Sequence, residues 1–104
     1  MDKKYTSFTE FYPFYLSQHQ NLTCRRLHFI GSALIVLVIA YVIYTQQYVA
    51  LFSLPVIGYG FAWIGHFMFE KNRPATFTYP VWSLMGDWKM FWQMLTRQLP
   101  PVTD

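Results

Sequence analysis

The sequence predicts an all-α membrane protein: a helical hairpin that crosses the bilayer twice, flanked by an interfacial helix on each side. Residues 27–69 contain no Asp, Glu, Lys or Arg, and this stretch is long enough for two spans of about 20 apolar residues each. Charged residues make up only 12% of the chain, against roughly 25% in soluble domains. Aromatic residues reach 21%, which is typical where Trp and Tyr lie at both membrane interfaces.

The composition limits the function classes that need to be considered. The 104 residues leave room for one membrane domain, residues 1–104,. The net charge of +3 is scattered over short segments, so we expect no nucleic-acid partner and instead contact with anionic membrane lipid. Cys24 is the only cysteine, which excludes a disulfide within the chain.

The first predicted element is an interfacial helix over residues 5–18. Ser7 and Glu10 have the spacing of a capping box,. Apolar and aromatic side chains then recur at helical spacing on one face: Phe8, Phe11, Tyr12, Tyr15 and Leu16,. Pro13 interrupts this pattern, so a start of the helix at Pro13 stays open.

Two spans follow, over residues 22–45 and 48–70, with Asn21 as the expected N-cap of the first,. Gln46 and Gln47 form the turn, because they are the only clearly polar pair between the two apolar runs. Pro55 and several glycines interrupt the second span. A membrane helix tolerates them where neighbouring groups satisfy the backbone.

The last predicted element is an amphipathic helix over residues 87–99, capped by Asp87 and ended by Pro100 and Pro101. Its apolar stripe consists of Trp88, Phe91, Trp92, Leu95 and Leu99. Such a helix lies in the headgroup plane.

Basic residues predict the orientation. They precede the first span and follow the second, and none lies at the turn: Lys3, Lys4, Arg25, Arg26, Lys71 and Arg73. By the positive-inside rule both termini face the cytoplasm. The membrane would be a bacterial inner membrane or, in a eukaryote, that of the endoplasmic reticulum.

The hairpin brings two histidines to one depth. His28 and His66 each lie 19 residues from Gln47, and antiparallel helices with equal rise per residue place them at the same level. Small residues on the facing surfaces favour close helix approach: Gly31, Ser32, Gly58, Ala62 and Gly65,.

A metal site is the functional hypothesis for this level. Glu70 follows His66 by four residues and shares its helix face,. His19, in the membrane-proximal segment, can fold over the same end of the hairpin. His19, His28, His66 and Glu70 would suit Fe(II), with Zn(II) as the alternative. The competing interpretations are interfacial histidines bonded to carbonyls or headgroups, and a Glu70 that pairs with Arg25 or Arg26.

Lys71, Asn72 and Arg73 form a polar segment after the second span. They are either topology and headgroup anchors or groups that hold a substrate carboxylate, for which a guanidinium is well shaped. Two other functions stay open: a Zn-dependent lipid hydrolase or isomerase, and a non-catalytic membrane protein whose polar cluster fastens the helix ends.

Three stretches carry a family resemblance: FYPFYLSQHQN, RRLHFIG and GYGFAWIGHFMFEKNRPATF. They resemble a small membrane-protein family, formerly of unknown function, over roughly residues 8–99. Its fungal member is the endoplasmic-reticulum dioxygenase of phytosphingosine breakdown. The resemblance implies Fe(II)-dependent α-oxidation, in which a 2-hydroxy fatty acid and O2 give a fatty acid one carbon shorter.

Residue by residue, the resemblance implies catalytic and metal-binding roles for His19, His28 and His66. Glu70 and Arg73 match the charged part of the family's downstream motif. The fungal enzyme is longer and has more hydrophobic segments than this chain. We therefore expect the acyl pocket to come from the amphipathic helices or from a second subunit in a homodimer.

Overall fold

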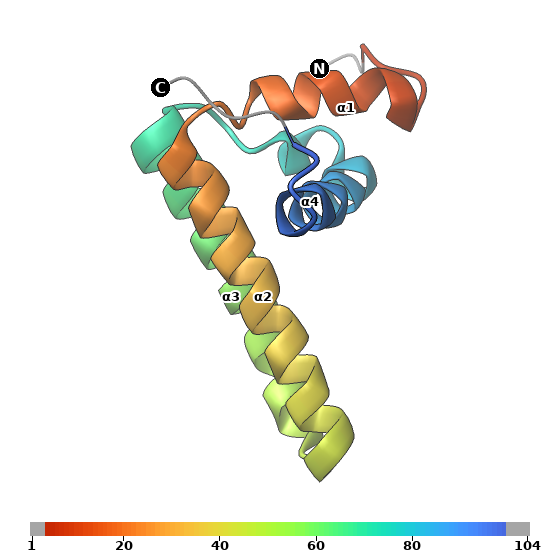
Figure 1. The fold of residues 1–104 in the computed structure, drawn as a ribbon, viewed down its shortest axis with the longest axis vertical. Helices are drawn as coiled ribbons and strands as arrows, with labels where there is room; N and C mark the ends of the chain where they lie inside the picture. Colours follow the sequence, from red (N-terminus) through yellow and green to blue (C-terminus); the bar gives the residue numbers. More distant parts are fainter. Residues whose placement is uncertain (1–3, 100–104) are drawn as a thin grey trace.

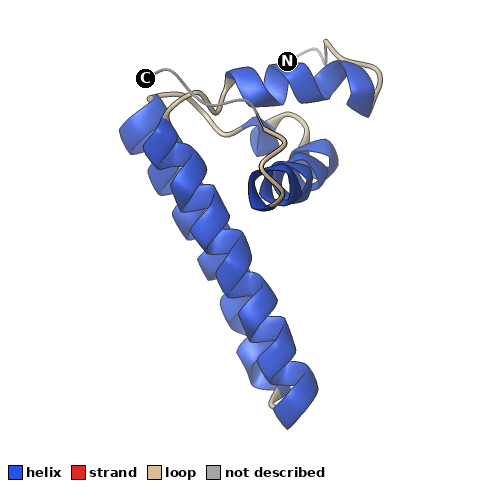
Figure 2. Ribbon diagram, viewed as in Figure 1, coloured by secondary structure: helices blue, strands red, loops and turns tan. Residues whose placement is uncertain are grey.

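The computed structural model describes residues 4–99, so the predicted stop at Pro100 and Pro101 and the basic residue Lys3 lie outside the described range. Within that range every regular element is helical (Figure 2). Four α-helices are joined by shorter helical segments: α1 (Phe8–Ser17), α2 (Leu22–Thr45), η1 (Tyr48–Phe52), α3 (Ser53–Ile64), η2 (Gly65–Glu70), η3 (Ala75–Phe77) and α4 (Pro80–Leu95). The all-α fold class is confirmed.

The hairpin is formed by α2 and by the continuous run from η1 to η2, which lie side by side and antiparallel (Figure 1). The Asn21 side chain caps α2 by accepting a hydrogen bond from the backbone N–H of Cys24 at 3.1 Å. At the other end Gln46 adopts a left-handed conformation with φ of 58°, which ends α2 and reverses the chain.

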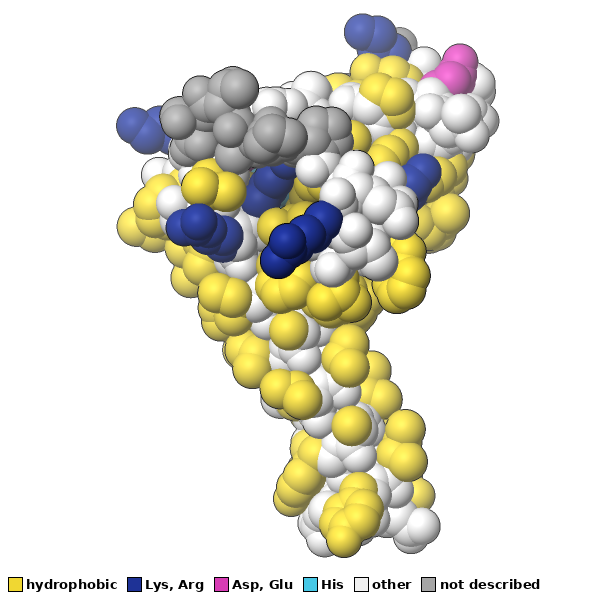
Figure 3. All heavy atoms as spheres, in the orientation of Figure 1, with side chains coloured by type: hydrophobic (Ala, Val, Ile, Leu, Met, Phe, Trp, Pro, Cys, Tyr) yellow, Lys and Arg dark blue, Asp and Glu magenta, His cyan; other side chains and the backbone are white. Residues whose placement is uncertain are grey.

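Both arms are long and apolar enough to cross a membrane. Leu22–Thr45 has 24 residues and a mean hydropathy of 2.3, and Tyr48–Glu70 has 23 residues and a mean hydropathy of 1.5. Large apolar side chains cover the outside of the hairpin (Figure 3), and Tyr44 and Phe52 are 90% and 81% exposed. An apolar surface of this extent needs apolar surroundings.

Glycine allows the two arms to approach closely. A Cβ atom at Gly31 would lie 3.0 Å from the Cβ of Phe61, and one at Gly58 would lie 3.3 Å from Cδ1 of Ile35. These contacts fix the lateral spacing of the arms by backbone proximity, as is common between membrane helices.

The second arm is irregular at both ends. It begins as the 3₁₀ segment η1, and Pro55 lies in the first turn of α3, where an unpaired backbone amide costs little. It ends as a π-helical turn, η2, which carries His66. Widened turns of this kind are frequent at functional sites.

An aromatic layer lies across the end of the hairpin opposite the turn, where α1 and α4 are found (Figure 1). Its buried core comes from α1, η3, the residue before α4, and α4: Phe11, Tyr12, Tyr15, Ala75, Tyr79 and Met90. The Tyr79 hydroxyl accepts from the backbone N–H groups of Lys4 and Tyr5 at 2.6 and 3.1 Å. This layer is the main buried core within residues 4–99.

Two helix starts differ in detail from the sequence-based expectation. Helix α1 is capped by Ser7, whose hydroxyl accepts from the Glu10 N–H at 3.2 Å. Pro13 therefore lies inside the helix. The Glu10 carboxylate accepts from the backbone N–H of Thr6 at 3.0 Å and from its hydroxyl at 2.7 Å.

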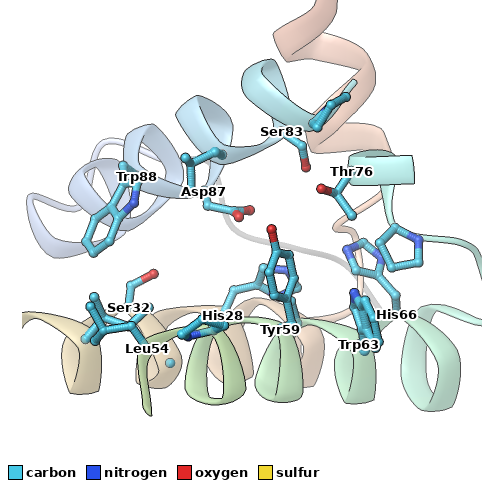
Figure 4. A pocket seen from close by; sticks show the side chains of 18 residues that line it. His28, Ser32, Leu54, Tyr59, Trp63, His66, Thr76, Ser83, Asp87 and Trp88 are labelled. Atoms are coloured by element: carbon cyan, nitrogen blue, oxygen red, sulfur yellow. The ribbon is translucent and has the colours of Figure 1, made fainter. Parts of the chain in front are cut away.

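The last helix begins at Pro80, so the expected start at Asp87 is wrong. Proline suits the first helical position because its fixed φ is helical and its missing N–H has no partner there. Asp87 consequently lies in the middle of α4, one turn after Ser83. Both side chains are directed at the hairpin (Figure 4).

Candidate metal centre

Three imidazole rings converge at the junction of the hairpin and the aromatic layer. The ring centroids lie 4.6 Å apart for His19 and His28, 4.4 Å for His19 and His66, and 5.0 Å for His28 and His66. His19, His28 and His66 are 1%, 6% and 2% exposed, respectively. His28 comes from α2 and His66 from η2, at matching depth in the two arms. His19 comes from the loop between α1 and α2.

Two of the rings are oriented by backbone carbonyls. His19 Nδ1 lies 2.6 Å from the carbonyl oxygen of Tyr15, and His28 Nδ1 lies 2.9 Å from that of Cys24. A carbonyl oxygen only accepts, so both Nδ1 atoms must carry the proton and donate it. In each case the partner is four residues earlier, one helical turn away.

The third ring is oriented by Asn72. The Asn72 amide nitrogen donates to the backbone and side-chain oxygens of Gln18 at 3.2 and 3.0 Å. This fixes the amide orientation and leaves Asn72 Oδ1 facing His66 Nδ1 at 2.7 Å. Since Oδ1 only accepts, His66 also carries its proton on Nδ1.

All three Nε2 atoms therefore present lone pairs without protons. His19 Nε2 and His28 Nε2 lie 3.2 Å apart, with neither able to donate to the other in this tautomer. Burial, followed by the neighbouring imidazoles His28 and His66, lowers the pKa of His19 well below its usual value, so a second proton is disfavoured. The His66 ring contacts both of the others, and a cation among the three rings would stabilise these lone pairs. Histidines that bind metals also donate their other N–H to a fixed oxygen in this way.

Cys24 is the fourth member of this buried group, whose ligand atoms all lie within 4.8 Å of one another. Its Sγ lies 3.7 Å from His28 Nδ1, the nitrogen that donates to the carbonyl of Cys24. The thiol also packs on Gly65, where a Cβ atom would lie 2.9 Å from Sγ. Three imidazoles and one buried thiol are thus the candidate ligands that the structure brings together.

Glu70 and Arg25 support the centre from the start of α2. Glu70, expected as a fourth ligand, lies outside the group of ligand atoms. Its carboxylate accepts from the backbone N–H of Asn21 at 2.5 Å, next to the helix N-terminus, where negative charge is favoured. Buried Arg25 donates from Nε to the carbonyl of His19 at 2.6 Å and so holds the loop that carries this histidine.

The remaining predicted site residues lie at the edge of the centre. Lys71 and Arg73 are exposed. Lys71 has a left-handed conformation with φ of 59°, which ends η2. The Arg73 guanidinium lies 5.1 Å from the ring centroid of Phe77. Of the three residues expected to bind substrate, the structure brings only Asn72 to the histidines.

A cavity of about 300 Å³ opens beside the centre, between the hairpin and α4 (Figure 4). His28 and His66 line it, so an ion held by the three rings would be open to this cavity. Its far end is apolar, with Ile35, Leu54 and Pro55 among the lining residues.

Tyr15 connects the centre to α4. Its ring stacks on His19 with a centroid distance of 4.1 Å and an interplanar angle of 26°, and its hydroxyl donates to Asp87 Oδ1. A Cβ atom at Gly86 would lie 3.0 Å from the Tyr15 ring, so glycine is needed for this contact. Sequence reasoning assigned Tyr15 only to an apolar stripe, although its position four residues before His19 is the signal for ring contact.

Comparison with known proteins shows which family the chain belongs to. No curated protein and no solved structure matched the chain. Residues 5–99 match the family described as 2-hydroxy-palmitic acid dioxygenase Mpo1-like. The match covers α1, both arms of the hairpin and α4, and with them all three histidines. The chain therefore belongs to the Mpo1-like family.

Proposed function

We propose that the protein is an Fe(II)-dependent dioxygenase that shortens 2-hydroxy fatty acids by one carbon. The observation that carries the proposal is the set of three Nε2 lone pairs, each fixed by an Nδ1–H hydrogen bond, beside a cavity with an apolar end. The family description names the matching substrate class, 2-hydroxy-palmitic acid. In the overall reaction a 2-hydroxy acid and O2 give the shorter acid, CO2 and water.

The donor set fits a divalent transition metal. Three neutral imidazoles suit Fe(II), and they are also the ligand set of some catalytic zinc sites, so Zn(II) is the alternative. When bound, Fe(II) would supply the chemistry that activates O2. It would also offer a positive charge to the hydroxyl and carboxylate of the substrate. Glu70 as a further ligand is part of the proposal, and Glu70→Gln tests it through iron affinity.

The protein's own side chains would position the substrate. The acyl chain would lie toward Ile35 and Leu54, where apolar walls exclude water,. The carboxyl end would lie near His28 and His66, on the side of the cavity that faces the three rings. Arg73, with Lys71, is proposed to attract and orient the substrate carboxylate from the edge of the site. Asn72, expected from the sequence to share this role, is proposed to act through His66, because its amide N–H groups are donated to Gln18.

The proposed location is an integral membrane position with the metal centre on the cytoplasmic side. Arg25, Arg26, Lys71 and Arg73 all lie at the end of the hairpin that carries the histidines, and the turn at Gln46 and Gln47 carries no charge,. A fatty acid dissolved in the bilayer would then meet the cavity at the depth of its own headgroup.

The test uses the detergent-purified protein, loaded anaerobically with Fe(II). We expect about one iron per chain, oxygen uptake on addition of 2-hydroxypalmitate, and formation of the 15-carbon acid. His66→Ala is expected to lose both iron and turnover. Bound iron without oxygen uptake, across several chain lengths of 2-hydroxy acid, would refute the enzymatic proposal.

The non-catalytic alternative makes a different prediction. If the histidines only fasten the helix ends, the protein should bind neither Fe(II) nor Zn(II), and His66→Ala should change stability alone. The buried arrangement argues against this alternative, because three acceptors without a donor between them weaken a fold that contains no cation. Zinc retention with lipid hydrolysis would instead support the hydrolase.

A further inference from the structure

The wall of the cavity opposite the histidines carries a carboxylate that the metal centre does not use. Asp87 projects from α4 into the cavity (Figure 4). Its Oδ1 accepts from the Tyr15 hydroxyl, and within residues 4–99 this is the hydrogen bond that the structure gives its carboxylate. Asp87 is not among the side chains whose ligand atoms cluster with the histidines. One carboxylate oxygen is thus held and the other is available to a molecule in the cavity.

The chemistry of the cavity lining makes this carboxylate distinctive. Among the described residues that line the cavity, Asp87 is the one acid, and no Lys or Arg lines it. Ser83 precedes Asp87 by one turn on the same face of α4, but a hydroxyl both donates and accepts. An ionised carboxylate accepts only, so Asp87 favours a ligand group that carries a proton and repels a ligand carboxylate.

The state of the pair follows from its surroundings. Burial and the negative charge of Asp87 raise the pKa of Tyr15 well above 10, so the tyrosine keeps its proton and donates. Burial raises the pKa of Asp87 to about 6, against the opposing effect of the Tyr15 hydrogen bond. The carboxyl group is therefore mainly ionised at pH 7. A buried carboxylate with one donor is stabilised by a second donor.

We propose that Asp87 is the residue that recognises the 2-hydroxyl group, by accepting a hydrogen bond from it, and so makes the site select 2-hydroxy acids over unsubstituted fatty acids. This inference rests on the proposed function. A 2-hydroxy acid brings the one hydroxyl donor that the free carboxylate oxygen lacks, whereas palmitate leaves that oxygen unpaired. Repulsion between Asp87 and the substrate carboxylate would also turn the carboxylate away from α4.

The test compares the binding of two ligands that differ only in this hydroxyl. Dissociation constants for 2-hydroxypalmitate and palmitate are measured anaerobically on the Fe(II)-loaded protein, so that no turnover occurs. Contact between the metal and the hydroxyl favours 2-hydroxypalmitate in every variant. The readout is therefore the change that a mutation causes in the ratio of the two dissociation constants. A hydrogen bond to a charged group should make 2-hydroxypalmitate bind about 10- to 100-fold more tightly than palmitate. We expect Asp87→Ala to lose about that much selectivity and to bind palmitate at least as tightly as the wild type.

Two further variants keep the result interpretable. Asp87→Asn retains the shape but replaces the charge by a neutral amide, so its selectivity should fall between those of the wild type and Asp87→Ala. Ser83→Ala removes a polar group from the same face of α4 and should keep most of the selectivity. Iron content and thermal stability, measured for each variant, report whether the centre and the fold are intact.

The opposing outcomes are distinct. Equal weakening of both ligands in Asp87→Ala, or equal loss of selectivity in Ser83→Ala, would overturn the role of Asp87, and so would loss of iron in Asp87→Ala. Full selectivity in Asp87→Ala, with wild-type conversion of 2-hydroxypalmitate intact, would overturn this inference alone. A wild-type protein that binds neither acid would overturn the proposed function and this inference together.

Discussion

Asn72 provides the sharpest test of how the metal centre is built. In Asn72→Ala the acceptor that lies 2.7 Å from His66 Nδ1 is removed, so the ring loses its fixed orientation and its tautomer. The hydrogen bond itself contributes about 1 kcal/mol. Loss of such supporting contacts typically lowers metal affinity 10- to 100-fold, or about 1.4–2.8 kcal/mol. We expect a weakening in this range for both Fe(II) and Zn(II), measured anaerobically by competition with a chelator.

Asn72→Asp is the matched control for this prediction. A carboxylate also accepts from His66 Nδ1, so metal affinity should stay within about threefold of the wild type. Both variants lose the donation to Gln18, and the difference between them isolates the contact with His66. Unchanged metal affinity in Asn72→Ala would refute the reasoning. If the KM for substrate rose at the same time, Asn72 would instead act on the substrate.

Three further predictions concern stability in detergent. Gly31→Ala places a Cβ atom 3.0 Å from that of Phe61 and should destabilise the hairpin by about 1–3 kcal/mol. The control Gly60→Ala has nothing within 4 Å of the added atom and should be neutral. Equal melting temperatures for the two variants would contradict this prediction. Burial lowers the pKa of His19, so the unfolded chain takes up the proton first and the metal-free protein should lose stability as pH falls below about 6.5; a flat melting temperature from about pH 8 to about pH 5 would exclude this. Burial raises the pKa of Asp87 to about 6, so Asp87→Asn should stabilise the protein at pH 7.5 by on the order of 1 kcal/mol. No gain is expected below about pH 3, where the wild-type carboxyl is protonated whether folded or unfolded. A gain of equal size at both pH values would show that its cause is packing.

The meeting of His28 and His66 was accessible from sequence because helix geometry is uniform. Two antiparallel helices with the same rise per residue bring residues equidistant from the turn to one depth, and a single polar pair at Gln46 and Gln47 marks that turn. The polarity pattern and the count are enough, and no side-chain packing has to be known. For the same reason, the two long apolar arms could be assigned.

The contacts that orient the rings were not accessible in this way. Asn72 reaches His66 only because Lys71 adopts a left-handed conformation with φ of 59°, which turns the chain back over the end of η2. No residue pattern requires this conformation at a lysine. Similarly, the role of Asp87 depends on where α4 begins. An aspartate before an apolar stripe is typical of an N-cap, and the competing signal, a proline at the first helical position, was the one that prevailed.

His19 gives the centre a structural consequence that the hairpin alone would lack. The two arms supply two ligands, and the third comes from the loop after α1, held by Arg25 and stacked against Tyr15. A cation shared by all three rings would connect the aromatic layer to the two arms of the hairpin. A ligand that binds only the folded state stabilises that state by RT ln(1 + [L]/Kd). Because Tyr15 joins His19 to α4, this stabilisation should extend to the cavity wall that carries Asp87. Because Tyr15 contacts both His19 and Asp87, it joins the group proposed to hold the metal to the group proposed to select the substrate.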